Sequence, residues 1–157
     1  MSWDFDNKSL KFILFLARLQ KPKQILEIGT YMGNTSKALA RAFPESQVTT
    51  IEKDHIFYSQ ANENITEKNI RLIHGNAKEV MPDIETKFDL IFIDAMKKQY
   101  LAYLEILEKK QLINKNCIIV ADNVISHKEK MQEYLDYVKK NYDSITIPIG
   151  DGLEVSK

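Results

Sequence analysis

Apolar residues along the chain alternate between two patterns. Short, mainly apolar runs are typical of strands buried on both faces of a sheet, and they occur at 25–28, 48–51, 70–73, 88–93 and 117–121. Between these runs, apolar residues recur at three- and four-residue steps, as on one face of a helix. The first such helix ends at Pro22, and either Asn7 or Ser9 could cap its start.

Strands that alternate with helices predict a parallel sheet with right-handed crossovers. The end of the chain differs, because the turn 150–152 separates two short strand-like runs and predicts an antiparallel hairpin. Pro148 lies in the first of these runs, which indicates a sheet edge or a strand end. We therefore expect one α/β domain over 1–157: a Rossmann-like, seven-stranded, mostly parallel sheet with a C-terminal antiparallel hairpin and helices on both faces.

A glycine turn follows the first apolar run, within QILEIGTYMGNTS (24–36). Gly29 and Gly33 allow positive φ and a close approach of the backbone to a ligand, and a helix that opens near Thr35 offers free N–H groups to an anion. A dinucleotide fingerprint would need glycines at two positions that hold Tyr31 and Asn34. The turn predicts a different nucleotide-like cofactor, with an ordinary strand-to-helix turn as the alternative.

Polar residues stand at the ends of later strands, where ligands bind in open parallel sheets. Glu52 follows the glycine turn by about 20 residues, the spacing of a ribose-binding carboxylate. Asp94, Asp122 and Asn123 offer hard oxygen ligands suited to Mg²⁺, although helix caps use the same residue types. Three histidines lack the paired spacing of a zinc site: His55, His74 and His127.

Composition narrows the class of protein. The 157 residues are 44% hydrophobic and suit one globular domain. Twenty-two basic and 22 acidic side chains lack the basic excess of most nucleic-acid-binding proteins. The single Cys117 forms no intrachain disulfide, and no apolar stretch approaches the ~20 residues that span a bilayer. The first ten residues contain no signal-peptide core. A cytoplasmic protein is expected, with no membrane partner.

Several segments resemble one family. Glu27-x-Gly29-x-x-x-Gly33 resembles motif I of class I S-adenosylmethionine-dependent methyltransferases. FIDAMKKQY from Phe92, VADNVISH from Val120 and GDGLE from Gly150 resemble, in order and spacing, segments of cation-dependent O-methyltransferases of the catechol and caffeoyl-CoA type. This similarity extends from about Trp3 to Lys157.

The resemblance implies Mg²⁺-dependent transfer of a methyl group from S-adenosylmethionine to a hydroxyl of an acceptor with adjacent oxygens. It implies that Lys97 and Asp94 are catalytic, with Lys97 as the base, and that the cation is held by Asp94, Asp122 and Asn123. Glu52 would hold the ribose, Thr35 would contact the methionine carboxylate, and the segment 75–77 would run alongside the adenine. The implied cofactor residues are Glu27, Gly29, Tyr31, Gly33, Thr35, Glu52, Asn76, Ala77 and Asp94.

The sequence also departs from the family pattern. Relatives carry additional N-terminal helices that cover the site, whereas here Trp3 and Phe5 are the candidates for this cover. The acidic substrate contact of the catechol enzymes falls near Ile145 and is absent. A small hydroxylated acceptor is expected. The alternatives are methylation of a hydroxylated uridine in transfer RNA and a non-catalytic cofactor-binding module that acts with a partner; a homodimer is left open.

Overall fold

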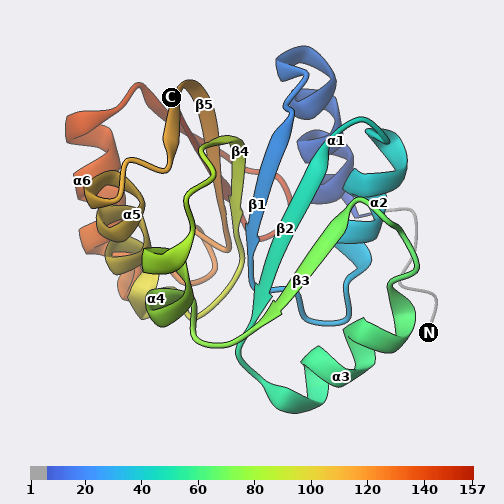
Figure 1. Cartoon of the computed structure of the whole chain (residues 1–157). Helices are drawn as coiled ribbons and strands as arrows, with labels where there is room; N and C mark the ends of the chain where they lie inside the picture. Colours follow the sequence, from blue (N-terminus) through green and yellow to red (C-terminus); the bar gives the residue numbers. More distant parts are fainter. Residues whose placement is uncertain (1–6) are drawn as a thin grey trace.

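One mixed sheet organises the computed structural model, which describes residues 7–157. Its strand order is β3-β2-β1-β4-β5-β7-β6 (Figure 1). The five parallel strands are β1 (Gln24–Ile28), β2 (Gln47–Glu52), β3 (Ile70–His74), β4 (Phe88–Ile93) and β5 (Ile113–Asp122). Two antiparallel strands complete the sheet: β6 (Ser144–Ile147) and β7 (Leu153–Ser156). The predicted fold, including the C-terminal hairpin, is confirmed.

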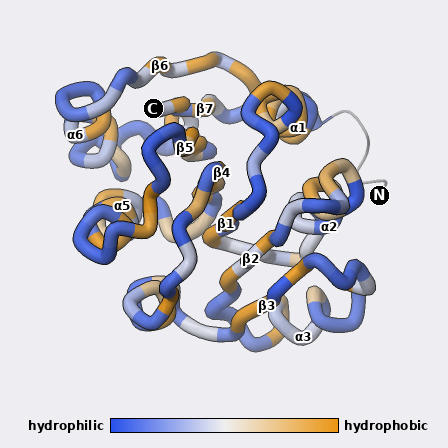
Figure 2. Tube along the Cα trace, turned by 45° about the horizontal axis from the view of Figure 1, so that its top comes forward, coloured by the Kyte–Doolittle hydropathy of each residue, from blue (hydrophilic) through white to orange (hydrophobic). Residues whose placement is uncertain are grey.

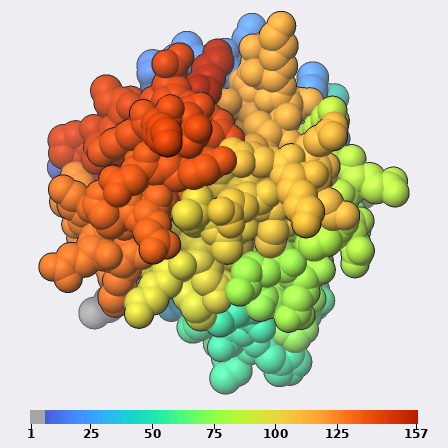
Figure 3. Space-filling model, turned by 90° about the vertical axis from the view of Figure 1, so that its left-hand side faces the viewer, coloured from blue at the N-terminus to red at the C-terminus, as the bar shows by residue number. Residues whose placement is uncertain are grey.

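Helices cover both faces of this sheet. Figure 1 shows α1 (Lys8–Gln20), α2 (Asn34–Ala42) and α3 (His55–Asn64) on one side. The opposite side carries α4 (Ala77–Val80), α5 (Tyr100–Lys109) and α6 (Gln132–Asn141), which lie side by side over that face (Figure 3). Three short 3₁₀ helices, Met81–Asp83, Lys97–Gln99 and Lys128–Lys130, join these elements.

The apolar side chains form a core on each face of the sheet. Ile13 and Ala17 of α1 pack with Leu39 of α2 on one face. On the other face, residues of α5 and α6 such as Leu104 and Leu135 pack against the strands. Figure 2 shows hydrophobic positions concentrated along the strands and the inner sides of the helices. Because β1, β2 and β4 are covered on both faces, their sequences are mainly apolar.

Side-chain caps fix where two helices begin. Asn7 Oδ1 accepts a hydrogen bond from the Leu10 N–H at 3.1 Å, so Asn7 rather than Ser9 caps α1. Asp54 Oδ1 accepts the N–H groups of Ile56 and Phe57 at 2.9 and 3.1 Å and starts α3. These start signals were readable from the sequence because capping needs a short oxygen-bearing side chain at one position.

The start of β5 differs from the sequence prediction, whereas Pro148 lies at a strand end and a sheet edge, as expected. β5 begins at Ile113, because Asn114 donates its side-chain N–H to Asp89 Oδ1 at 2.7 Å and ties this polar stretch to β4. The predicted run at 117–121 is therefore only the apolar part of the strand. β6 ends at Ile147, so Pro148 follows the strand, and β6 lies at the edge of the sheet. Proline therefore removes no hydrogen bond from the ladder.

The strand order reverses between β1 and β4, since successive crossovers run outward from this point in opposite directions. Such a switch point leaves a crevice beyond the carboxyl ends of the two strands. The proposed cover residues Trp3 and Phe5 lie outside the described residues. Within 7–157, no helix combines the length and the apolar character that a membrane crossing requires.

Candidate active site

The glycine turn brings the ends of β1 and β4 into direct contact. Gly29 has φ +99°, and a Cβ built on it would lie 2.1 Å from the Asp94 carbonyl oxygen. Its N–H donates to the Ile51 carbonyl at 3.0 Å, which also joins it to β2. Only a residue without a side chain fits this position. Gly33, with φ +84°, precedes α2 and provides no side-chain cap, so the helix start keeps its free N–H groups.

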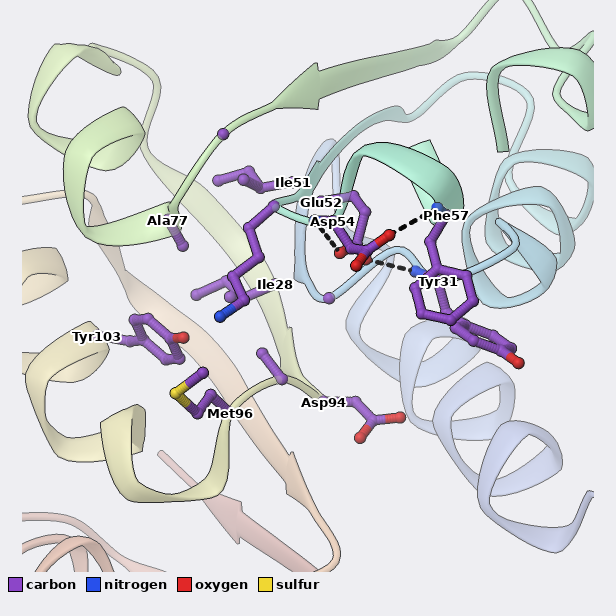
Figure 4. Close-up of a pocket in the computed structure, with 14 residues that line it drawn as sticks. Ile28, Tyr31, Ile51, Glu52, Asp54, Phe57, Ala77, Asp94, Met96 and Tyr103 are labelled. Carbon is purple, nitrogen blue, oxygen red and sulfur yellow. Dashed lines mark hydrogen bonds between the residues drawn. The ribbon is translucent and has the colours of Figure 1, made fainter. Parts of the chain in front are cut away.

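A pocket of about 380 Å³ opens at the carboxyl ends of β1, β2 and β4. Figure 4 shows Tyr31 and Phe57 on one side of it and Ala77, Met96 and Tyr103 on the other. The rings of Tyr31 and Phe57 have centroids 4.3 Å apart. The remaining lining residues include Ile28, Gly29, Ile51, Glu52, Lys53, Asp54, Gly75, Asp94 and Ala95. An apolar pocket with a few carboxylates at its wall is suited to a nucleoside-like ligand.

Glu52 presents its carboxylate at the wall of this pocket and is held by backbone groups. Its Oε2 accepts the Tyr31 N–H and its Oε1 accepts the Asp54 N–H, each at 2.8 Å (Figure 4). The side chain is buried. A carboxylate fixed by two backbone donors keeps one orientation without a ligand, and its remaining lone pairs can accept hydroxyl groups.

Glu27 lies beneath the glycine turn and does not line the pocket. Its Oε2 accepts hydrogen bonds from the hydroxyls of Ser36 and Thr50, the latter at 2.6 Å. Burial raises the pKa of Glu27 to about 7, and the two hydroxyl donors offset only part of this effect. In this position Glu27 ties β1 to α2 and β2, and its predicted contact with the cofactor stays a prediction.

Asp94 and Asp122 stand on neighbouring strand ends. The β4–β5 ladder ends with Ile93 opposite Ala121, and the residues that follow this pair are Asp94 and Asp122. Burial and the charge of Asp94 raise the pKa of Asp122 to about 6. The two carboxylates therefore repel each other and share one region of negative potential.

Asn123 completes the predicted cation-binding set. It adopts φ +67°, and its side-chain N–H₂ lies 3.5 Å from Asp151 Oδ2. This contact with a carboxylate directs the amide nitrogen toward Asp151 and leaves the amide oxygen available. Within 7–157, no three side chains of His, Cys, Asp or Glu gather as a metal cluster, so a cation here would depend on two carboxylates and one amide oxygen.

Lys97 occupies the space beside Asp94. Its Nζ lies 3.0 Å from Asp94 Oδ1, and 19% of its side chain is exposed. Nζ also lies 5.8 Å from the centre of the Tyr100 ring. This ion pair places the predicted base, Lys97, next to the predicted metal ligand Asp94, which also lines the pocket.

The structure brings together part of the predicted cofactor set. Gly29, Tyr31, Glu52, Ala77 and Asp94 line the pocket, whereas four predicted residues stand outside its lining: Glu27, Gly33, Thr35 and Asn76. Asn76 caps α4 by accepting the Lys78 N–H at 3.1 Å, and Thr35 lies in the first turn of α2. The roles assigned to these residues remain predictions.

The lining residues that sequence reasoning missed include two aromatic side chains. Phe57 and Tyr103 lie inside helices, where an apolar stripe toward the pocket reads like one toward the core.

Comparison with known proteins identifies the family. The family model described as "O-methyltransferase" matches residues 4–147. Catechol O-methyltransferase of Niastella koreensis is 33% identical over 132 residues, covering 78% of this chain and 59% of the relative. Catechol O-methyltransferase B of Danio rerio is 31% identical over 131 residues, covering 76% and 48%.

Among solved structures, the O-methyltransferase TomG of Streptomyces achromogenes, in complex with SAM, superposes with a TM-score of 0.81 at 26% identity, covering 94% of this chain and 78% of TomG. The chain spans about half the length of the curated relatives described above. The match to the family model covers most of the chain, which therefore belongs to the O-methyltransferase family.

Proposed function

We propose that this protein transfers a methyl group from S-adenosylmethionine to a hydroxyl oxygen of an acceptor with adjacent oxygens, in a reaction that depends on Mg²⁺. One observation carries the proposal: Asp94 both lines the pocket and stands beside Asp122 at adjacent strand ends. A cofactor in the pocket would therefore reach the carboxylates that position the acceptor. The names of the catechol O-methyltransferase relatives and the SAM complex of TomG support the same chemistry.

The pocket supplies separate contacts for the parts of S-adenosylmethionine. Glu52, fixed by two backbone N–H groups, would accept the ribose hydroxyls. The start of α2 has no side-chain cap, so its N–H groups and dipole suit the methionine carboxylate. Ala77, Met96 and Tyr103 form an apolar side of the pocket for the adenine. The Gly29 position leaves room for the chain of the cofactor.

The acidic pair fits a hard divalent cation. Two carboxylates and an amide oxygen match the ligands that Mg²⁺ prefers, and a cation would relieve the repulsion that raises the pKa of Asp122. Asp94, Asp122 and Asn123 would hold it. Mg²⁺ bound there would lower the pKa of a hydroxyl beside it.

Lys97 would accept the proton of that hydroxyl. Its Nζ lies 3.0 Å from Asp94 Oδ1, so a cation held by Asp94 would leave the lysine amine available to the acceptor. The acceptor oxygen attacks the methyl carbon, the carbon–sulfur bond breaks, and the proton moves to Nζ. Much of the rate enhancement would come from holding the two reactants in a near-attack arrangement.

The rim of the site favours a small, flat acceptor. Tyr31, Met96 and Ile125 are large apolar side chains that remain 42–49% exposed, and they follow β1, β4 and β5 respectively. Such side chains would stack against an aromatic ring that carries adjacent hydroxyls. The equal numbers of basic and acidic residues offer less support for an RNA acceptor.

Methyl transfer from labelled S-adenosylmethionine tests the proposal. Catechols, caffeoyl esters, hydroxyflavonoids and hydroxyuridine-containing RNA would be offered with Mg²⁺, with Zn²⁺ and with EDTA. We expect turnover of a small dihydroxylated acceptor with Mg²⁺ and its loss with EDTA. Transfer only to RNA would show that the acceptor is a nucleic acid and not a small hydroxylated molecule. Cofactor binding without turnover of any acceptor would contradict catalysis and support a non-catalytic module.

A further inference from the structure

Tyr100 joins the two strand ends that carry the acidic pair. It is the first residue of α5 and is fully buried. Its hydroxyl donates a hydrogen bond to the Asp122 carbonyl at 3.2 Å. The backbone of Ala95, directly after Asp94, lies near the same phenol oxygen. One side-chain oxygen therefore connects the chain beyond β4 with the end of β5.

This connection begins where the sheet stops holding the strands together. The last paired residues of β4 and β5 are Ile93 and Ala121. Beyond them, Asp94 and Asp122 place two carboxylates on adjacent chain segments. The phenol bridges the segments at this point, in a buried environment where a hydrogen bond is worth more than at the surface.

The ring of Tyr100 is held as firmly as its hydroxyl. Tyr134 packs edge-on against it, with ring centroids 5.7 Å apart and an interplanar angle of 86°. Lys97 Nζ lies over the Tyr100 ring, 5.8 Å from the ring centre.

We propose that Tyr100 is a positioning residue for the cation site, which sets the spacing between Asp94 and Asp122. The inference rests on the proposed function, because it assigns a support to the site described there. Mg²⁺ demands near-ideal octahedral geometry, so a change in the separation of two ligands weakens binding. Partners that orient metal ligands typically contribute 10–100-fold to metal affinity. No direct contact between Tyr100 and the cation is required.

The test compares Tyr100→Phe with Tyr134→Phe. Both changes remove one buried phenol hydroxyl from the same ring cluster, but the Tyr134 hydroxyl has no hydrogen-bond partner among the described residues. Binding of Mn²⁺, a spectroscopic substitute for Mg²⁺, would be measured by electron paramagnetic resonance, and binding of S-adenosylhomocysteine by calorimetry. We expect Tyr100→Phe to weaken Mn²⁺ by about 10-fold or more while cofactor affinity stays unchanged. Tyr134→Phe should match the wild type in both.

Equal Mn²⁺ affinity in Tyr100→Phe and wild type would overturn the inference, as would an equal loss in Tyr134→Phe. Asp122→Ala separates this outcome from failure of the proposed function. If wild type binds Mn²⁺ and Asp122→Ala does not, the cation site stands and only the role of Tyr100 is in question. Absence of Mn²⁺ binding in the wild type would overturn both.

A measurement on the wild-type protein covers the case in which Tyr100→Phe does not fold. With ¹³C at the Cζ of tyrosine, the Tyr100 signal reports the hydrogen bonding of its own hydroxyl. We expect this signal to shift as Mg²⁺ is added, in step with occupancy of the site, while the Tyr134 signal stays in place. A Tyr100 signal that does not move in protein saturated with Mg²⁺ would overturn the inference.

Discussion

The two halves of the candidate site differ in how their carboxylates are satisfied. In the cofactor half, formed around Glu27, Gly29 and Glu52, each carboxylate already accepts two hydrogen bonds from the protein. In the proposed cation half, formed by Asp94, Asp122 and Asn123, Asp94 pairs with a lysine, and among residues 7–157 the Asp122 carboxylate accepts only the adjacent Asn123 N–H, at 2.7 Å.

This difference indicates how much each half depends on a ligand. The cofactor half is preorganised, because backbone and hydroxyl donors fix its charges before anything binds. The cation half keeps two mutually repelling carboxylates, and a bound cation would lower their energy. Changes in the first half should therefore disturb folding or cofactor affinity, whereas changes at Asp122 or Asn123 should disturb cation binding and catalysis and leave cofactor affinity nearly unchanged.

The largest effect is expected for Gly29→Ala. A Cβ would lie 2.1 Å from the Asp94 carbonyl oxygen, and the backbone on both sides cannot yield without separating β1 from β4. We expect a loss of roughly 3–5 kcal/mol in the free energy of unfolding, measured by urea denaturation. Gly150→Ala is the control: its φ is +57°, and its Cβ would meet only the Ser9 hydroxyl, so about 1 kcal/mol is expected. Equal losses would contradict the assigned backbone contact.

The pH dependence of stability should report the buried Glu27. Its pKa rises from 4.5 to about 7 on folding, so between these pH values the folded state holds a proton that the unfolded chain has released. The contribution of Glu27 to the free energy of unfolding is therefore fully present below pH 4.5. It falls by roughly 3 kcal/mol as the pH rises toward 7. Urea denaturation at pH 5 and pH 8 should show a smaller fall in Glu27→Gln than in wild type.

Glu129→Gln serves as the control for the pH series, because Glu129 is exposed and should keep the wild-type fall. The same fall in Glu27→Gln and wild type would show that Glu27 is not protonated in the folded protein.

A smaller effect is expected on cofactor affinity when Glu52 is changed. Glu52→Ala removes a carboxylate fixed at the pocket wall and should weaken S-adenosylmethionine by roughly 1.5–3 kcal/mol, the range for a lost charged hydrogen bond. Calorimetry measures this loss, with Glu63→Ala on the exposed surface of α3 as the control. NAD should give no binding heat with the wild type. Binding of NAD instead of S-adenosylmethionine would contradict the assignment of the pocket.

Strand ends were the part of the site that the sequence predicted best. Glu52, Asp94 and Asp122 each follow a mainly apolar run, and parallel strands place such ends at one edge of a sheet. The glycine spacing was equally informative, because the contact of Gly29 with Asp94 tolerates no side chain. The fold followed from the alternation of apolar runs and helical stripes.

Contacts made across the fold could not be read from the sequence. Ser36 and Thr50 hold Glu27 beneath the turn, which the sequence did not indicate, because the approach of Ser36 depends on how α2 packs; the contact of Glu27 with the cofactor stays a prediction. Tyr100 appeared only as one member of an apolar stripe on a helix. Its bridge between two strand ends depends on the approach of α5 to the sheet, which periodicity does not specify.

Asp122→Asn tests most directly whether the two halves act separately. The change removes one charge of the proposed cation site and leaves the lining of the pocket intact. We predict that S-adenosylhomocysteine affinity, measured by calorimetry, stays within about twofold of wild type, which is about 0.4 kcal/mol, while Mg²⁺-dependent methyl transfer is lost. Transfer that survives both Asp122→Asn and EDTA, or a parallel loss of cofactor affinity, would contradict this account.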